Sequence, residues 1–226
     1  MNKFKIVVAT RESTELFFKN TATGRSLALY NSPLVDLQLF EKNNAGLSHL
    51  YNMVIDESVG SSDVIIFMHD DIHIIDYYWL DKVAAGLEVF DVVGLAGNRG
   101  RQPFQPSWLF KNMNFECDHQ SNLSGIVGHG TCFPPEKLSI YGAPCQPVKI
   151  LDGLFLACKS EKLHLTGTRF DEKFRFHAYD LDFCRSAEKN GMTLGTWDIP
   201  VIHESQGGYD AGWKLEIDKY FEKWGN

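Results

Sequence analysis

Val64-Ile65-Ile66-Phe67-Met68-His69-Asp70-Asp71-Ile72-His73 is the stretch of sequence that decides the fold. Its first half is a continuous apolar run, which is typical of a strand buried on both faces in the middle of a parallel sheet. The chain then changes to histidine and aspartate, at the strand end where open α/β sheets bind ligands. Adjacent carboxylates repel each other, and a divalent cation commonly relieves that repulsion. The stretch therefore predicts a central strand that carries a metal site, although a solvated turn with a helix-capping aspartate also fits these residues alone.

The composition is that of one globular domain. With 226 residues, 44% of them hydrophobic, the chain can bury a full core without a second domain. A net charge of -7 and the lack of a dense lysine or arginine run argue against nucleic acid as a partner. No apolar run approaches the roughly 18 to 20 residues of a transmembrane segment, and residues 1–5 lead into a strand instead of a signal peptide. We therefore expect a cytoplasmic protein, with a peripheral position at the inner membrane face as a further option.

Two common kinds of site are missing from the sequence. The five cysteines are odd in number and lack any C-x-x-C spacing, so we expect reduced thiols and neither disulfides nor a structural zinc site. There is no G-x-x-x-x-G-K-[ST] loop, and no G-x-G-x-x-G follows the first strand. Recognition of phosphate would therefore depend on a metal ion.

Strand and helix patterns alternate along the first part of the chain. Such alternation predicts the α/β class, with a mostly parallel central sheet and helices on both of its faces. The expected order is a strand at 4–9, a short amphipathic piece at 15–19, a glycine-containing link to Tyr30, a strand at 35–40, a helix at 47–55, the strand at 64–68, a helix at 77–87 and a strand at 89–96.

Residues 97–147 differ because glycines and prolines interrupt every potential element. A long stretch without periodicity inside a compact domain is typical of a functional loop region, so we interpret it as an irregular acceptor or lid segment. Arg99 and Arg101 lie near its start, where they either steady a diphosphate or are solvated surface arginines. Three aromatic residues of the segment form either a sugar-stacking platform or a local core: Trp108, Phe110 and Phe115.

The second half of the chain contains further candidate groups. Asp152 interrupts an apolar strand pair at 148–157, which places a carboxylate against the core, where it should have a partner or a task. Asp180 and Asp182 fall in the first turn of a helix, where capping and dipole compensation alone would explain them. His203 follows an apolar pair, a position where a structural histidine is the default.

The tail from Gly212 has the pattern of an amphipathic helix. Packing on the sheet is the simplest explanation of its apolar face. Pairing with another subunit in a homodimer, or contact with a membrane-bound lipid acceptor, would use the same face.

Several motifs occur in a recognisable order: Asn43-Asn44-Ala45-Gly46-Leu47 leading to Tyr51-Asn52, Phe67-Met68-His69-Asp70-Asp71, Leu151-Asp152-Gly153, Phe176-His177-Ala178-Tyr179-Asp180-Leu181-Asp182-Phe183, and His203-Glu204-Ser205-Gln206-Gly207-Gly208. In this order they resemble the glycosyltransferase family 2 group of the A-type glycosyltransferase (GT-A) fold. The resemblance is strongest to small bacterial and viral members whose D-x-D motif appears as His-Asp-Asp. It spans Lys5 to Gly208 and leaves the loop region uncovered.

The resemblance implies a single GT-A-like domain and a nucleoside-diphosphate sugar donor, with a UDP- or GDP-sugar expected. It also implies that the sugar is transferred to a hydroxyl of a glycan, lipid-linked or protein-linked acceptor. The expected parts are a nucleotide-binding half (1–96), the irregular acceptor or lid segment (97–147), a catalytic and acceptor half (148–208) and a C-terminal helical tail (209–226).

The resemblance also assigns binding roles to individual residues. Thr10, Arg11 and Glu12 would hold the nucleotide base, and Asn43, Asn44 and Gly46 would close the other side of the nucleoside. His69 and Asp70 would lie near ribose and metal, with Arg99 as a candidate for the diphosphate. Asp71 would be the main metal-binding carboxylate, and His203 would complete the site. The expected cofactor is Mn²⁺ or Mg²⁺, and Mn²⁺ tolerates histidine better.

For catalysis, the resemblance implies an inverting displacement with Asp180 as the base that takes the proton of the acceptor hydroxyl. Asp152 would lie near donor sugar or acceptor. The chain departs from the family pattern at two positions, because His69 replaces the first Asp of D-x-D and Tyr179 replaces the Glu that usually precedes the catalytic Asp. Both departures leave the metal carboxylate and the base in place.

Two other classes of protein remain open from the sequence. A sugar nucleotidyltransferase would share the layers and paired carboxylates, but it usually has a glycine-rich basic loop where this chain has Thr10-Arg11-Glu12-Ser13. A catalytically inactive glycan-binding relative would keep the aromatic loop but would not need Asp180 together with Asp71 and His203.

Overall fold

The apolar run 64–68 is strand β3, and every one of its residues is buried, so both faces of the strand are covered as the sequence predicts. The structure is a computed structural model that describes residues 3–61, 63–205 and 207–225. Its larger sheet contains seven strands in the order β2 (Val35–Phe40), β1 (Phe4–Ala9), β3 (Val64–Met68), β11 (Phe155–Lys159), β5 (Val92–Gly94), β12 (Leu194–Thr196) and β9 (Pro147–Val148).

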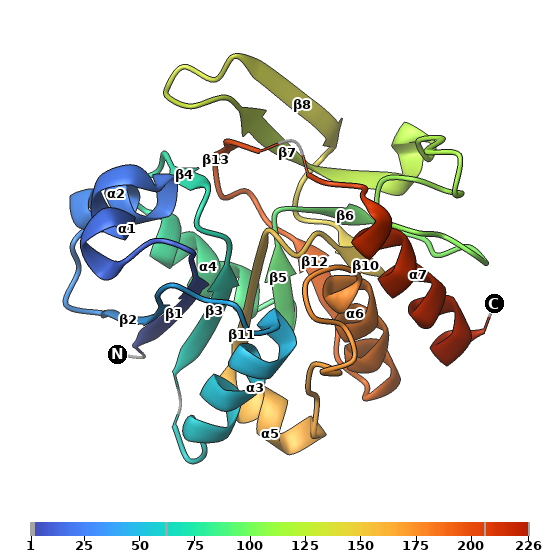
Figure 1. Cartoon of the computed structure of the whole chain (residues 1–226), viewed down its shortest axis with the longest axis horizontal. Helices are drawn as coiled ribbons and strands as arrows, with labels where there is room; N and C mark the ends of the chain where they lie inside the picture. Colours follow the sequence, from blue (N-terminus) through green and yellow to red (C-terminus); the bar gives the residue numbers. More distant parts are fainter. Residues whose placement is uncertain (1–2, 62, 206, 226) are drawn as a thin grey trace.

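A smaller sheet adjoins the larger one (Figure 1). It contains β10 (Ile150–Leu151), β6 (Ala96–Asn98), β7 (Leu123–His129), β13 (Val201–His203) and β4 (Ile72–Ile74) in that order, with β8 (Lys137–Gly142) paired to β7. The helices are α1 (Thr14–Asn20), α2 (Ala22–Leu29), α3 (Leu47–Glu57), α4 (Trp79–Leu87), α5 (Ser160–Thr166), α6 (Tyr179–Lys189) and α7 (Ala211–Trp224), with a 3-10 turn η1 at Gln120–Asn122.

The α/β class is confirmed, but the larger sheet is mixed, which corrects the expectation of a mostly parallel sheet. β1 pairs in parallel with β2 and β3. The chain then returns from the smaller sheet and inserts β11 antiparallel between β3 and β5. The apolar pattern of a single strand carries no information on the direction of its neighbours, so the sequence could not predict this insertion.

The link expected between residues 20 and 30 is wrong, because this segment forms helix α2. Its N-cap, Thr21, accepts a hydrogen bond from Gly24 N at 3.0 Å. Gly24 also allows α1 and α2 to cross closely, since a Cβ there would lie 2.1 Å from the carbonyl oxygen of Phe17. The glycine that suggested a link is therefore the residue that lets the two helices pack.

The strand expected at 89–96 is divided, because β5 belongs to the larger sheet and β6 to the smaller one. Residues 97–147 are also more regular than expected, since β7 and β8 form an antiparallel hairpin that lies at the top of Figure 1. Gly125 lies at a register shift in this hairpin with a φ of 111°, and a Cβ there would lie 2.1 Å from the Leu95 carbonyl oxygen. The glycines thus permit a bulge and a close approach instead of ending the strands.

The tail forms helix α7 and packs on the domain. Trp213, Ile217 and Tyr220 are buried. Near its end, Trp224 Nε1 donates to Asp182 Oδ1 at 2.7 Å, and Lys223 Nζ lies 2.7 Å from the same oxygen. Asp182 is therefore a buried anchor for the tail. No helix in the described ranges is long and apolar enough to cross a bilayer, and all five cysteines are free thiols.

Gly24→Ala tests the close crossing of α1 and α2. An exposed glycine inside a helix would gain about 1 kcal/mol on replacement by alanine. Here we expect the opposite sign, a loss of about 1 to 3 kcal/mol in the free energy of unfolding, because the new methyl group meets backbone atoms. Urea denaturation measures the difference.

Gly100→Ala is the matched control, since a Cβ there has its nearest neighbour at 3.7 Å. Its free energy of unfolding should change by no more than about 0.5 kcal/mol. A stabilised Gly24→Ala variant would contradict the packing described for α2.

Candidate active site

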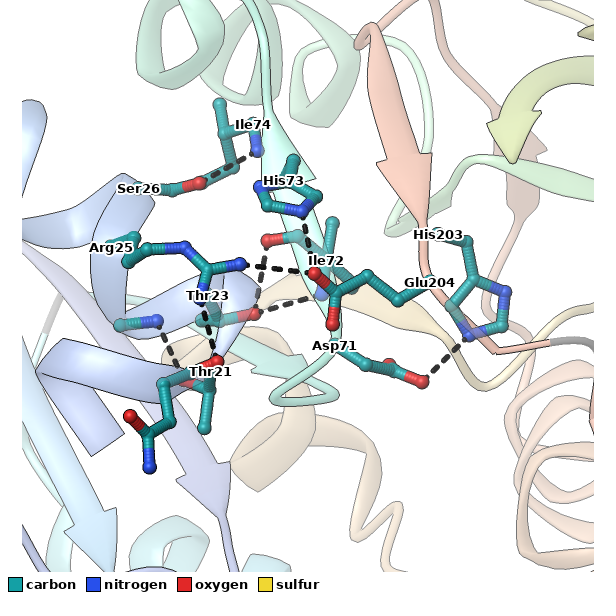
Figure 2. Close-up of polar contacts among 12 residues, drawn as sticks. Thr21, Thr23, Arg25, Ser26, Asp71, Ile72, His73, Ile74, His203 and Glu204 are labelled. Carbon is teal, nitrogen blue, oxygen red and sulfur yellow. Dashed lines mark hydrogen bonds and ion pairs between the residues drawn. The ribbon is translucent and has the colours of Figure 1, made fainter. Parts of the chain in front are cut away.

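Helix α2 holds the turn that follows β3. Thr23 is completely buried, and its Oγ1 donates to the carbonyl oxygen of His69 at 2.7 Å and accepts from Ile72 N at 3.2 Å. Its own N–H donates to the carbonyl oxygen of Asp70 at 3.1 Å. Figure 2 shows Thr23 facing this turn and Asp71 pointing away from it toward His203. One threonine therefore fixes both ends of the His-Asp-Asp turn.

His69, Asp71 and His203 form a group that could hold a metal ion, and we call it the His-Asp-His cluster. One ligand atom from each residue lies within 4.8 Å of the other two. His203 Nε2 is 3.1 Å from Asp71 Oδ2, and His69 Nδ1 is 4.0 Å from Asp71 Oδ1. The structure thus adds His69 to the two metal ligands expected from the sequence.

The ionisation of Asp71 and His69 suits a cation, whereas the hydrogen bond and the charge of Asp71 raise the pKa of His203. Burial alone would raise the pKa of the Asp71 carboxyl, but the hydrogen bond from His203 and the charges of both histidines hold it well below its usual range. Burial lowers the pKa of His69, which favours its neutral, metal-binding form. Asp71 Oδ1 is buried and has no hydrogen-bond partner among the described residues. A carboxylate with two imidazoles and one unpaired buried oxygen fits a divalent cation.

Further polar contacts join the segments that carry Asp71 and His203. His73 Nε2 lies 2.7 Å from Glu204 Oε1, and Arg25 of α2 donates to the same oxygen at 3.0 Å (Figure 2). His203 and Ile72 are directly opposite each other in the β13 and β4 pair. This pairing brings residue 203 next to the turn after β3, which the sequence order alone does not indicate. Gln206, part of the sequence motif after His203, lies outside the described residues.

The cluster opens into a cavity of about 480 Å³, which we call the central cavity. Asp152 and Asp180 line it together with the three residues of the cluster. Asp180 Oδ2 accepts from Gly153 N at 3.0 Å and Oδ1 from Leu181 N at 2.9 Å, so its carboxylate is held at the start of α6. Burial, with the negative charge of Asp152 adding to it, raises the pKa of Asp180 to about 7. A carboxylate with such a pKa is suited to taking up a proton near neutral pH.

A second hollow of about 670 Å³ lies over the carboxyl ends of β1 and β2, and we call it the β1–β2 groove. Six residues that the sequence assigned to nucleotide binding all line it: Thr10, Arg11, Glu12, Asn43, Asn44 and Gly46. Asp70 faces this side, because its Oδ2 accepts from Thr10 Oγ1 at 2.6 Å. Asp70 and Asp71 line both hollows, so the turn after β3 lies at their junction.

The strip 175–177 forms another part of this junction. The carboxylate of Glu216 in α7 is 8% exposed and accepts hydrogen bonds from the backbone N–H groups of all three residues of the strip, the shortest at 2.9 Å from His177 N. On the other side, Leu47 N at the start of α3 donates to the carbonyl oxygen of Arg175 at 2.6 Å. The strip is therefore fixed between the C-terminal helix and α3, with Phe176 and His177 lining both hollows.

Two arginines singled out in the sequence lie elsewhere. Arg99 lines a separate hollow beside Lys149 and Glu188 and is not among the residues that line the central cavity or the groove. Arg101 donates to Glu188 Oε2 at 2.6 Å and to the Lys149 carbonyl oxygen at 2.6 Å, so it is structural. The structure therefore does not bring Arg99 to the diphosphate position proposed for it.

The three loop aromatics lie in two different places. Trp108 lines the central cavity and packs edge-on against Tyr141, with ring centroids 4.7 Å apart. Phe110 and Phe115 instead form a local aromatic cluster with residues near the tail, including Tyr209.

Sequence reasoning gave no role to Arg175 or His177, and it noted Tyr179 only as a departure from the family pattern. Arg175 lines the β1–β2 groove, where it donates to the Asn44 carbonyl oxygen at 3.2 Å, and His177 lies at the junction. Tyr179 contacts His69 Nε2 at 2.9 Å. All three lie between Phe174 and Asp180, and His177 and Tyr179 belong to a motif already recognised in the sequence. The density of histidine, arginine and tyrosine before a helix was a usable signal there.

The sequence places the chain in a known family. Residues 11–223 match the family described as "Glycosyltransferase like family". The chain therefore belongs to this glycosyltransferase family, which confirms the resemblance to family 2 enzymes and supports glycosyl transfer as its class of reaction. No curated protein sequence matches the chain.

Three solved structures are distantly similar. A197 from STIV has 11% identity and a TM-score of 0.47, with 92% of this chain and 97% of that chain covered. TarS from S. aureus has 14% identity and a TM-score of 0.49, covering 96% and 38%. The mannosyltransferase PcManGT from Pyrobaculum calidifontis, in complex with GDP-Man and Mn²⁺, has 14% identity and a TM-score of 0.48, covering 92% and 58%. At these scores they carry no argument about this chain, and its family rests on the sequence match.

Thr23→Val tests the support of the His-Asp-Asp turn. Valine keeps the shape of the side chain but leaves the Ile72 N–H and the His69 carbonyl without their partner. We expect a loss of about 1 to 3 kcal/mol in the free energy of unfolding and weaker Mn²⁺ binding.

Ser26→Ala is the comparison, because Ser26 lies one turn later in α2 and accepts from Ile74 N at 3.0 Å, beyond the turn. It should lower stability to a similar extent and affect Mn²⁺ affinity less. Equal effects of both variants on Mn²⁺ affinity, measured by calorimetric titration, would contradict a specific role for Thr23.

Proposed function

We propose that this protein is a metal-dependent, inverting glycosyltransferase that moves a sugar from a nucleoside-diphosphate sugar to an acceptor hydroxyl. The β1–β2 groove would hold the nucleotide, and the central cavity would hold the sugar and the acceptor. A UDP- or GDP-sugar donor and a glycan, lipid-linked or protein-linked acceptor are the proposed substrates.

One observation carries the proposal most directly. The His-Asp-His cluster and the Asp180 carboxylate line the same cavity, and this cavity meets the groove at Asp70 and Asp71. A diphosphate reaching from the groove to the junction would present its sugar to the central cavity. The anomeric carbon would then lie between the leaving diphosphate and a hydroxyl activated by Asp180.

The proposed step is a single displacement. Asp180 takes the proton of the acceptor hydroxyl, whose oxygen forms a bond to the anomeric carbon as the bond from that carbon to the diphosphate oxygen breaks. The N–H groups of Gly153 and Leu181 hold the Asp180 carboxylate in place for this transfer. One base suffices for a displacement from the opposite face, which supports inversion.

Residues that line the two hollows would stabilise the negative charge of the leaving diphosphate. Arg11 and Arg175 line the groove and are suited to contact phosphate oxygens. A divalent cation held by the His-Asp-His cluster would neutralise the charge that develops on the departing diphosphate. The two imidazoles favour Mn²⁺ over Mg²⁺.

Two substitutions separate the binding of the nucleotide from the transfer of the sugar. Asp71→Ala removes the carboxylate of the cluster and should abolish metal-dependent nucleotide binding. Asp180→Asn keeps the size of the side chain and should retain that binding while turnover falls by at least about a hundredfold, within the range that general bases contribute. Calorimetric titration with nucleoside diphosphates and a sugar-transfer assay measure the two effects. Normal turnover by Asp180→Asn would show that another group is the base.

The pH dependence of kcat/KM provides an independent check on Asp180. Because the base must be ionised and its pKa is raised to about 7, activity should fall as the pH drops below about 7. Asp152→Asn removes a negative charge that raises this pKa, so the midpoint of the acid limb should move to lower pH. A midpoint that stays in place or moves upward in Asp152→Asn would contradict the coupling of the two carboxylates.

A further inference from the structure

The two positions at which this chain departs from the family pattern are in direct contact. His69 Nε2 and the hydroxyl oxygen of Tyr179 are 2.9 Å apart, although the residues come from the end of β3 and the start of α6. The same hydroxyl lies 2.9 Å from the carbonyl oxygen of Gly153, to which it donates. Three residues thus form one chain of hydrogen bonds that ends at the His-Asp-His cluster.

The protons in this chain can be assigned from its chemistry. A carbonyl oxygen can only accept, so the single phenol proton of Tyr179 goes to Gly153. The Tyr179 oxygen must then accept from His69, which places the imidazole proton on Nε2. Nδ1 of the neutral ring is left with a free lone pair, and this is the atom that faces Asp71 Oδ1 at 4.0 Å.

The surroundings of Tyr179 keep this arrangement in one geometry. Tyr179 is 4% exposed, and its ring packs among Tyr51 and Phe170, with centroid distances of 5.9 and 6.2 Å. Residue 153 must be small, because a Cβ there would lie 2.4 Å from the Tyr179 hydroxyl oxygen. The glycine of the Asp152-Gly153 motif therefore gives the tyrosine access to a backbone carbonyl.

We propose that Tyr179 is a positioning residue that holds His69 as its Nε2–H tautomer and so presents Nδ1, together with Asp71, to a divalent cation. This inference rests on the metal-dependent function proposed above, and it adds a residue that orients one of the proposed metal ligands. The unpaired buried oxygen Asp71 Oδ1 lies on the same side, where the cation would be its partner. Tyr179 would touch neither the metal nor the substrate, and it would act only through His69.

A double-mutant cycle on Mn²⁺ affinity tests the inference without relying on catalysis. The four proteins are the natural chain, Tyr179→Phe, His69→Asp and the double variant, each titrated with Mn²⁺ alone and followed by loss of the EPR signal of free Mn²⁺. Tyr179→Phe should weaken Mn²⁺ binding by about 10- to 100-fold in the natural chain. In the His69→Asp background there is no imidazole to orient, so Tyr179→Phe should weaken Mn²⁺ binding by less than about twofold.

Tyr141→Phe is the matched control, because Tyr141 lines the same cavity from β8 and packs against Trp108. It should leave Mn²⁺ affinity unchanged. A long-range ¹H–¹⁵N correlation spectrum of histidine-labelled, metal-free protein gives the second readout. His69 should show a proton on Nε2 in the natural chain, and this preference should weaken in Tyr179→Phe.

The outcomes are distinct. Equal losses of affinity from Tyr179→Phe in both backgrounds, or no loss in either, would overturn the inference, as would an Nδ1 proton on His69 in the natural chain. A natural chain that binds no Mn²⁺ would overturn it together with the metal-dependent function. A natural chain that shows the predicted coupling but transfers no sugar would sustain the positioning role and refute the proposed function alone.

Discussion

The half-buried carboxylate of Asp71 places the strongest constraint on the candidate site. One of its oxygens is hydrogen-bonded to His203, while the other is buried with no hydrogen-bond partner among the described residues. Leaving a buried acceptor unpaired costs about 1 to 3 kcal/mol, and more for a charged group. An unpaired oxygen of this kind, facing a second imidazole, fits the divalent cation proposed as its partner. The two hollows also meet at this residue, because Asp71 lines both of them.

The fold supplies each partner of Asp71 from a different part of the chain. β3 ends in the turn that carries His69 and Asp71, and α2 fixes that turn through Thr23. The antiparallel pairing of β13 with β4 brings His203 to the same place. On the opposite side, α7 reaches back to hold the strip before α6 through Glu216. Elements distant in sequence therefore converge on one junction between the β1–β2 groove and the central cavity.

The sequence predicts the central features of the site because they depend on local pattern. An apolar strand followed by His-Asp-Asp predicts both the buried β3 and the position of its polar turn, and the polar ends of β1 and β2 predict the residues that line the groove. The same reasoning failed where glycine was interpreted as a breaker. Gly24 and Gly125 allow close contacts inside a helix pair and a hairpin, and such contacts depend on tertiary structure.

Contacts between segments that are distant in the chain could not be predicted from the sequence either. Arg99 lines a separate hollow, and its place in the sequence does not indicate that it lies away from the central cavity and the groove. His69 and Tyr179 each looked like a departure from the family pattern, and only the structure shows that they touch. The proposed orientation of His69 by Tyr179 joins these two departures in one arrangement.

The most direct test of a nucleotide-sugar site is a thermal-shift screen of the purified protein against UDP, GDP, CDP and dTDP, each with Mn²⁺ and with chelator. Because a ligand that binds only the folded state stabilises it by mass action, the account predicts a higher melting temperature with one of these nucleotides. That shift should disappear when the metal is removed. If none of the four nucleotides stabilises the protein in the presence of Mn²⁺, the proposal that the β1–β2 groove holds a nucleoside diphosphate is contradicted.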